Sequence, residues 1–177
     1  MGRWVVLFAA AAALYAVCCG AYYVGFFNDD AFYLIGARSL LTGSYLELNH
    51  PGLVPQTQYL PGWPFLLTPA AALGGFAAAR LTAALAMLAS VAAAAWCFAE
   101  DLDEEGRFLL AALCALNPLA VSLSGAVLTD APFTLGVLLT LGAARRLWSR
   151  PDGSVWFGLG VAAGATFLIR PLGVALP

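Results

Sequence analysis

The chain has no lysine, a single histidine and few charged residues of any kind. Only 10% of its 177 residues are charged, 62% are hydrophobic, and the mean hydropathy is +0.86. A soluble domain typically carries about 25% charged residues, so this chain cannot cover a globular surface with polar groups. The formal net charge of −2 leaves no basic footprint, which excludes nucleic acid as an expected partner and points to the lipid bilayer instead.

Cysteine is also scarce, and all four cysteines fall inside apolar stretches: Cys18, Cys19, Cys97 and Cys114. Cysteines in such surroundings behave as small buried hydrophobic residues. Their placement therefore predicts neither a disulfide framework nor a cysteine metal site.

Long apolar runs are what the chain does have, and a bilayer-spanning helix needs roughly 20 such residues. We predict an all-α fold, a polytopic transmembrane helix bundle of about five spans with interfacial helices in the first outer loop. The first run is uncharged, long enough to span and has no tidy small-x-small cleavage site before the polar loop, so we interpret it as a retained helix and not a signal peptide. The five runs are residues 4–27, 81–99, 108–129 (interrupted by Asn117-Pro118), 131–144 and 153–169.

The polar connection after the first run, within an outer loop over residues 28–80, predicts an interfacial helix over residues 31–41. Asn28 or Asp29 can cap this helix, and Thr42-Gly43 ends it. Residues 65–79 are apolar but short, and could either span the bilayer or lie in its interface.

The arginine distribution decides between these two topologies. If residues 65–79 lie in the interface, the cluster Arg145, Arg146 and Arg150 falls inside together with Arg3 and Arg107. Cytoplasmic loops carry an excess of Lys and Arg, which favours this choice. It predicts a plasma (inner) membrane protein whose 28–80 loop faces outward.

The same topology places three carboxylates, Asp29, Asp30 and Asp130, on the outer side. Acidic groups at the edge of a bilayer are costly, and mark a functional site by default. We interpret them as candidate catalytic residues, with Asp30 and Asp130 also candidate ligands of a divalent cation such as Mg²⁺ or Mn²⁺. The simpler alternative is that Asp29 or Asp30 caps one helix and Asp130 caps the helix that begins at Pro132.

Five further residues are candidate substrate-binding groups: Tyr33, Arg38, His50, Tyr59 and Arg170. The two arginines could hold a phosphate, although Arg38 could equally pair with a nearby carboxylate and Arg170 could simply extend to the interface. A histidine can exchange a proton near neutral pH, but one in a polar loop is more often incidental.

Several motifs together resemble those of a known family. The chain reads Asn-Asp-Asp-Ala-Phe-Tyr at 28–33, Ala-Arg-Ser-Leu-Leu-Thr-Gly at 37–43 and Tyr-Leu-Pro-Gly-Trp-Pro at 59–64. Leu-Thr-Asp-Ala-Pro-Phe at 128–133 and Arg-Pro at 170–171 follow in order. The pattern resembles the GT-C membrane glycosyltransferases, in the branch of bacterial relatives of protein O-mannosyltransferases and lipid A aminoarabinose transferases.

This resemblance implies an enzyme that moves a sugar from a polyprenyl-phosphate donor to an acceptor glycan, lipid or protein on the outer side of the membrane. Asp29 would be the base toward the acceptor hydroxyl, and Asp30 and Asp130 would assist it or hold the cation. Arginines would stabilise the leaving lipid phosphate. Some branches carry a lysine where this chain has Leu60, so the phosphate contacts are expected to differ.

The resemblance covers essentially the whole chain, but only the N-terminal part of a family member. We therefore expect residues 1–177 to be the N-terminal transmembrane part of a longer enzyme, that is, a fragment. The competing interpretation is a transporter or channel subunit in which Asp29, Asp30 and Asp130 bind a cation or protons. These carboxylates fall at predicted helix ends and not at the bilayer midplane, which favours the enzyme.

Overall fold

The computed structural model describes residues 2–20, 22–149 and 152–175, and this described part of the chain contains helices and no strand. The predicted all-α class is therefore confirmed. The elements are α1 (Gly2–Cys18), α2 (Asp29–Leu41), α3 (Gly62–Leu73), α4 (Gly75–Cys97), α5 (Glu104–Ala115), α6 (Pro118–Leu123), α7 (Asp130–Ser149), α8 (Gly153–Ile169) and the short 3₁₀ helix η1 (Pro171–Ala175).

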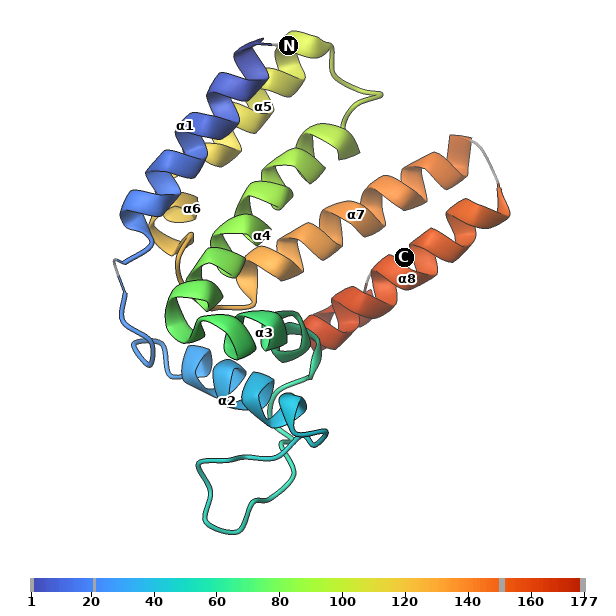
Figure 1. Ribbon diagram of the computed structural model, residues 1–177. Helices are drawn as coiled ribbons and strands as arrows, with labels where there is room; N and C mark the ends of the chain where they lie inside the picture. Colours follow the sequence, from blue (N-terminus) through green and yellow to red (C-terminus); the bar gives the residue numbers. More distant parts are fainter. Residues whose placement is uncertain (1, 21, 150–151, 176–177) are drawn as a thin grey trace.

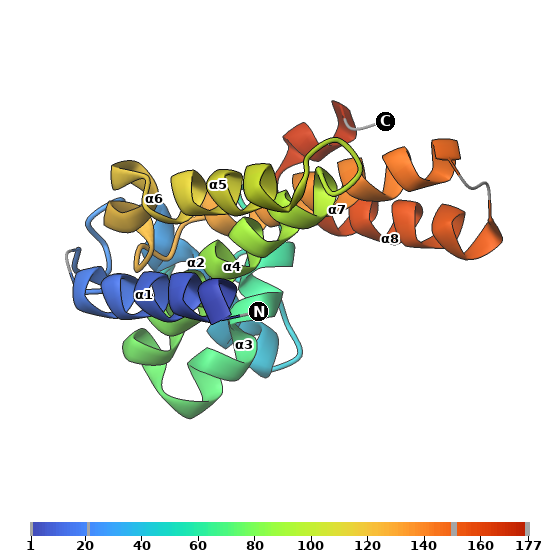
Figure 2. The same cartoon turned by 90° about the horizontal axis from the view of Figure 1, so that it is seen from above.

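The longer helices run side by side, and α2 and α3 lie across one end of them (Figure 1). α4 occupies the middle, with α1 and α5 on one side and the antiparallel pair α7 and α8 on the other (Figures 1 and 2). The loop between α2 and α3 projects from the α2–α3 end, away from the other helices (Figure 1). We call this the loop end, and the opposite one, beside the N-terminus, the N-terminal end.

The first helix is shorter than the sequence predicted. α1 ends at Cys18, whereas the apolar run continues to Phe27. Between them, Gly25 adopts a φ of 95°, a left-handed conformation that favours glycine and does not continue a right-handed helix. The last residues of the run therefore form a turn, not about two and a half further turns of helix.

The helix predicted over 31–41 is confirmed as α2, which ends where expected, with Thr42 at its C-cap and Gly43 at a φ of 76°. Asn28 occupies the N-cap position, but its side chain makes no capping hydrogen bond. The apolar segment that follows the loop is divided at Gly74 between α3 and α4, so α4 begins at Gly75 and not at residue 81.

The expected interruption at Asn117-Pro118 separates α5 from α6. The Asn117 side chain caps α6 by accepting from Leu119 N at 2.9 Å. That amide would otherwise bond the carbonyl of Ala115, which instead accepts from the buried Tyr15 hydroxyl at 2.9 Å. Because an unpaired carbonyl is costly in an apolar interior, Tyr15 stabilises the break from the neighbouring α1.

Two apolar clusters hold the helices together. One joins α2, α3 and α4 around Trp63 and Leu67 and also includes Val127, just before α7. The other joins α1, α4 and α5 around Ala11 and Val91. The first cluster fixes the loop end, where the candidate site lies.

In the described part of the chain, one helix, α4, is long and apolar enough to cross a bilayer, judged by length and composition alone. The helices α1, α3 and α8 are apolar but shorter. The ion pairs Arg3–Glu104 (3.0 Å), Arg3–Glu105 and Arg145–Asp101 lie at the N-terminal end. Arg146 lies over the Trp96 ring there at 3.7 Å.

Candidate active site

Asp29 begins α2 and is held by a tyrosine from the far side of the loop. The Tyr59 hydroxyl donates to Asp29 Oδ1 at 2.7 Å, and the Tyr59 ring stacks on Phe32 with centroids 5.4 Å apart. Burial, together with the hydrogen bond to Asp29, raises the pKa of Tyr59 above its usual range. Tyr59 therefore remains a protonated donor at neutral pH and orients the carboxylate.

The side chain of the neighbouring Asp30 makes different contacts, with backbone amides. It is only 3% exposed, Oδ2 accepts from Gly25 N at 2.9 Å, and Oδ1 accepts from Ala31 N at 2.9 Å. Hydrogen bonds from two backbone amides compensate for burying the carboxylate. In this arrangement Asp30 fastens the turn before α2 to the helix, while Asp29 faces the tyrosines.

Arg170 joins the end of α8 to the start of α7. Its NH2 lies 3.1 Å from Asp130 Oδ1, and its Nε donates to the Thr129 hydroxyl at 2.6 Å. The guanidinium also lies 5.7 Å from the centroid of the Phe133 ring. Asp130 is the first residue of α7, where a negative charge is favoured by the helix dipole.

Tyr33 lies between the Asp29–Tyr59 pair and the Arg170–Asp130 pair. Its ring packs edge-on against Tyr59, with centroids 5.1 Å apart. Burial raises the pKa of Tyr33; the neighbouring Thr129 and Arg170 oppose this shift, and Asp29 and Asp130 add to it. The Tyr33 hydroxyl is therefore within electrostatic reach of both carboxylates and of the arginine.

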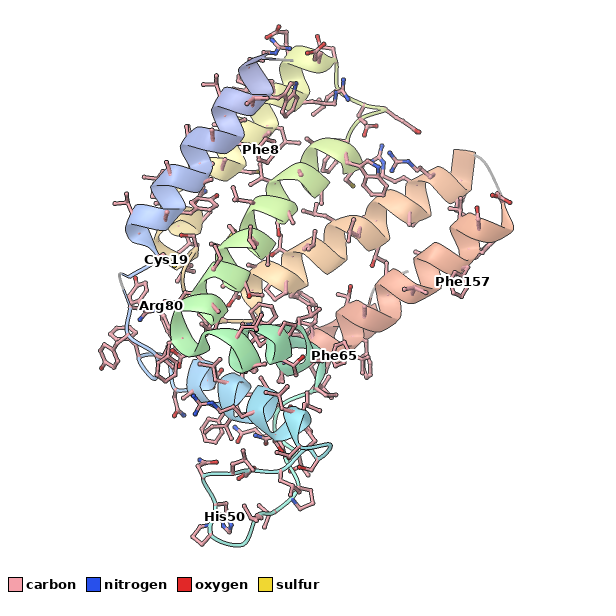
Figure 3. The ribbon with its side chains drawn as sticks, in the orientation of Figure 1. Phe8, Cys19, His50, Phe65, Arg80 and Phe157 are labelled. Atoms are coloured by element: carbon pink, nitrogen blue, oxygen red, sulfur yellow. The ribbon has the colours of Figure 1, made fainter. Side chains whose placement is uncertain are left out.

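Two predicted substrate-binding residues lie elsewhere. Arg38 is nine residues beyond Asp29, about 13 Å along the helix, and is exposed, with its guanidinium 5.9 Å from the Phe76 ring centroid. His50 is exposed on the projecting loop (Figure 3), and its Nδ1 accepts from Gly52 N at 3.1 Å. Neither is brought to the carboxylates in this structure.

A divalent cation needs several oxygen ligands that converge on one point. Within the described residues, no group of three or more Asp, Glu, His or Cys side chains converges in this way. Asp30 accepts hydrogen bonds from two backbone amides, and Asp130 forms an ion pair with Arg170. The donor set does not fit a preformed cation site, and we assign no step to a metal.

Thr129 is the residue that the sequence interpretation missed. It is 1% exposed, and it contacts both Arg170 and Tyr33. The motif at 128–133 contains Thr129, but its candidate site residue was the charged Asp130 beside it. A threonine directly before a helix-starting aspartate is the signal that could have identified it.

An apolar groove of about 360 Å³ runs from Asp130 between α4, α5, α6 and α7. Its walls include Met87, Val91, Leu123 and Leu138. It provides a hydrocarbon-lined path that ends at the acidic residue of the site.

The fold and the site define a class: an apolar helical protein whose acidic, basic and phenolic groups meet at one end of the helices. The family model described as dolichyl-phosphate-mannose-protein mannosyltransferase matches residues 49–177, and the chain belongs to this family. It is thus a membrane-embedded glycosyltransferase of the GT-C type, and the transporter interpretation receives no support. Comparison with curated proteins and with solved structures gives no match.

Proposed function

We propose that this glycosyltransferase moves a sugar from a polyprenyl-phosphate donor to an acceptor hydroxyl on the outer side of the membrane. Two groups of contacts support this most: Asp29 with Tyr59 and Tyr33, and Arg170 with Thr129 and Asp130. They provide a carboxylate, Asp29, of which one oxygen accepts a hydrogen bond, and a guanidinium, Arg170. Both lie at the loop end, opposite the arginines of the N-terminal end.

Asp29 is the base in this proposal. Tyr59 occupies Oδ1, so Oδ2 is the oxygen that takes the proton from the acceptor hydroxyl. The acceptor oxygen forms a bond to the anomeric carbon as the bond from that carbon to the phosphate oxygen breaks. The electron pair leaves with the polyprenyl phosphate, so no oxidant or reductant is needed.

Arg170 stabilises the charge that grows on the leaving phosphate. A guanidinium has five N–H donors, and Thr129 and Asp130 engage only part of them. Two fixed contacts hold the group in place before the substrate arrives, so little reorganisation is required during transfer. Leu60 provides no cation, which leaves this role to Arg170.

The groove that ends at Asp130 is the proposed path of the isoprenoid chain. Its lining is almost wholly apolar, as a hydrocarbon chain requires, and it leads the attached phosphate toward Arg170. The acceptor would then approach from the α2 side, where Asp29 lies.

Multiple spans of the inner membrane form part of the proposal. Exposed apolar side chains cover several helices, among them Val5 on α1, Leu85 on α4, Leu113 on α5 and Phe157 on α8. We infer that α1, α4, α5 with α6, α7 and α8 each cross the bilayer, and that α2 and α3 lie in its outer interface.

Carboxylate-to-amide substitutions in the full-length enzyme test the proposal. Asp29→Asn keeps the size of the side chain but removes the base, so sugar transfer should fall by about 10²–10⁴-fold. Asp130→Asn should also reduce transfer, because it releases one of the contacts that position Arg170. Transfer from a polyprenyl-phosphate sugar is measured in membranes at matched protein levels.

Glu100→Gln is the matched control, since Glu100 is exposed beyond α4 at the N-terminal end. Near-normal transfer by Asp29→Asn would remove this residue from the chemistry. Loss of transfer in the control as well would show that the assay reports the charge of the chain and not the site.

A further inference from the structure

Residues 22–27 form an exposed cluster of aromatic rings that the proposed chemistry does not use; we call it the aromatic turn. Tyr22 packs against Phe26 and Phe27 with centroids 5.0 and 4.9 Å apart, and Tyr23 packs edge-on against Phe26 at 5.6 Å. Tyr23 is nevertheless 70% exposed and Phe26 51% exposed. The rings therefore contact each other and present their outer faces to the surroundings.

The aromatic turn is held at two points. Arg80 of α4 donates from NH2 to the Tyr22 carbonyl at 2.6 Å. Asp30 accepts from Gly25 N at 2.9 Å. Figure 3 shows Arg80 beside the chain that follows Cys19, where α1 has ended. These two hydrogen bonds fix the backbone of the segment, so the exposed rings hold a defined position.

Two helix lengths place this surface at the same depth. α1 has 17 residues, about 25 Å, so it falls short of a hydrocarbon core of about 30 Å, and the aromatic turn follows its outer end. Along α4, Arg80 lies 17 residues before Cys97, again about 25 Å from the N-terminal end. A guanidinium on an apolar helix extends to the edge of the hydrocarbon. Both helices thus bring the aromatic turn to the outer edge of the hydrocarbon core, next to the lipid head groups.

We propose that the aromatic turn is an interfacial anchor that contacts lipid head groups and fixes the depth of Asp29 and Asp30. Tyrosine and other amphipathic aromatic side chains are enriched at this layer, and Arg80 adds a cation for lipid phosphate. Because Asp30 bonds Gly25 directly, the depth of the anchor is transmitted to the start of α2. The proposal requires a membrane-embedded chain but not the donor, the acceptor or the catalytic role of Asp29.

Depth-dependent quenching tests the anchor. Single cysteines are introduced in the full chain after replacement of Cys18, Cys19, Cys97 and Cys114, labelled with an environment-sensitive fluorophore, and reconstituted into phosphatidylcholine–phosphatidylglycerol vesicles. At Phe26→Cys, a nitroxide on the lipid head group should quench more strongly than one on the acyl chain. At Phe157→Cys, on the exposed face of α8, this order should reverse, and Leu53→Cys on the projecting loop should respond mainly to aqueous iodide.

A Phe26→Cys label that behaves like the Leu53→Cys label would overturn the proposal and would leave the rings free to stack on a saccharide in water. The link to α4 has its own test. Arg80→Gln should shift the strongest quenching of the Phe26→Cys label, whereas Arg38→Gln, at an exposed arginine stacked over Phe76, should not. An unchanged Phe157→Cys profile shows that each variant remains inserted, and an unchanged Phe26→Cys profile in Arg80→Gln would contradict the anchor.

Discussion

At the residue scale, the arrangement separates two adjacent carboxylates into different roles. Asp29 accepts a hydrogen bond from Tyr59, while Asp30 accepts one from Gly25 N in the turn that precedes the helix. Neighbouring residues at a helix start point about 100° apart, so one can be catalytic and the other structural. The aspartate pair of the motif is thus two residues with separate surroundings.

Tyr45, whose hydroxyl donates to the Tyr59 carbonyl, gives a prediction about alkaline pH. Burial, with a smaller contribution from Tyr33, raises the pKa of Tyr45 from 10.0 to about 12. The folded state therefore holds this proton more tightly than the unfolded state. Its contribution to stability is complete below about pH 10 and is lost as the pH rises through about 12. The free energy of unfolding should fall over this range less steeply in Tyr45→Phe than in the wild type.

The slope is the readout, because Tyr45→Phe also removes the hydrogen bond to the Tyr59 carbonyl at 2.9 Å. That loss, about 1 kcal/mol, lowers stability throughout the lower pH range, where the phenol is protonated. Unfolding in mixed micelles, followed by circular dichroism between about pH 9 and 12, gives both quantities. Parallel curves for the two proteins would show that Tyr45 does not retain its proton on folding.

At the element scale, the sequence predicted the helices better than their ends. The position of α2, the break at Asn117-Pro118 and the end of α8 at Arg170 follow from local rules for caps, proline and glycine. The early end of α1 does not, because residues 19–27 are as apolar as the helix before them. Arg80 holds this segment from α4 by donating to the Tyr22 carbonyl, a tertiary contact that no local pattern reveals.

The site was predictable to a similar extent. Topology alone placed Asp29, Asp130 and Arg170 at one end of the molecule, and the structure brings their surroundings together through Tyr33. The contact between Thr129 and Arg170 spans 41 residues and depends on how α7 meets α8. Sequence reasoning could not find it, because it requires knowledge of helix packing.

Two glycines give a matched test of that packing. A Cβ at Gly136 of α7 would lie 2.3 Å from Thr166 Oγ1 of α8, whereas a Cβ at Gly160 of α8 would have no atom within 4 Å. Alanine is favoured over glycine in a helix by about 1 kcal/mol at either position. Gly136→Ala should nevertheless destabilise the protein by about 1–3 kcal/mol, because α7 and α8 must move apart. Gly160→Ala should be neutral or stabilising.

Unfolding of both variants in mixed micelles measures the difference. Equal stability changes would show that α7 and α8 do not approach as closely as in this structure. A loss confined to Gly136→Ala would confirm the contact that sets Arg170 at the end of α8 against Thr129 at the start of α7.

At the scale of the whole molecule, charge and chemistry are divided between two ends. Arg3, Arg145 and Arg146 gather at the N-terminal end, while Asp29, Asp130 and Arg170 gather at the loop end. Since cytoplasmic segments are enriched in arginine, the N-terminal end should lie inside and the site outside.

Labelling of intact cells tests this orientation. In a background without Cys18, Cys19, Cys97 and Cys114, His50→Cys on the projecting loop should react with an impermeant maleimide. Glu100→Cys, also exposed but at the N-terminal end, should react only after the cells are opened. Both positions are solvent-accessible in the structure, so accessibility across the membrane and not burial decides the result. The reverse pattern would place Asp29 and Asp130 inside and would remove the outward-facing site, while leaving the fold and the family membership intact.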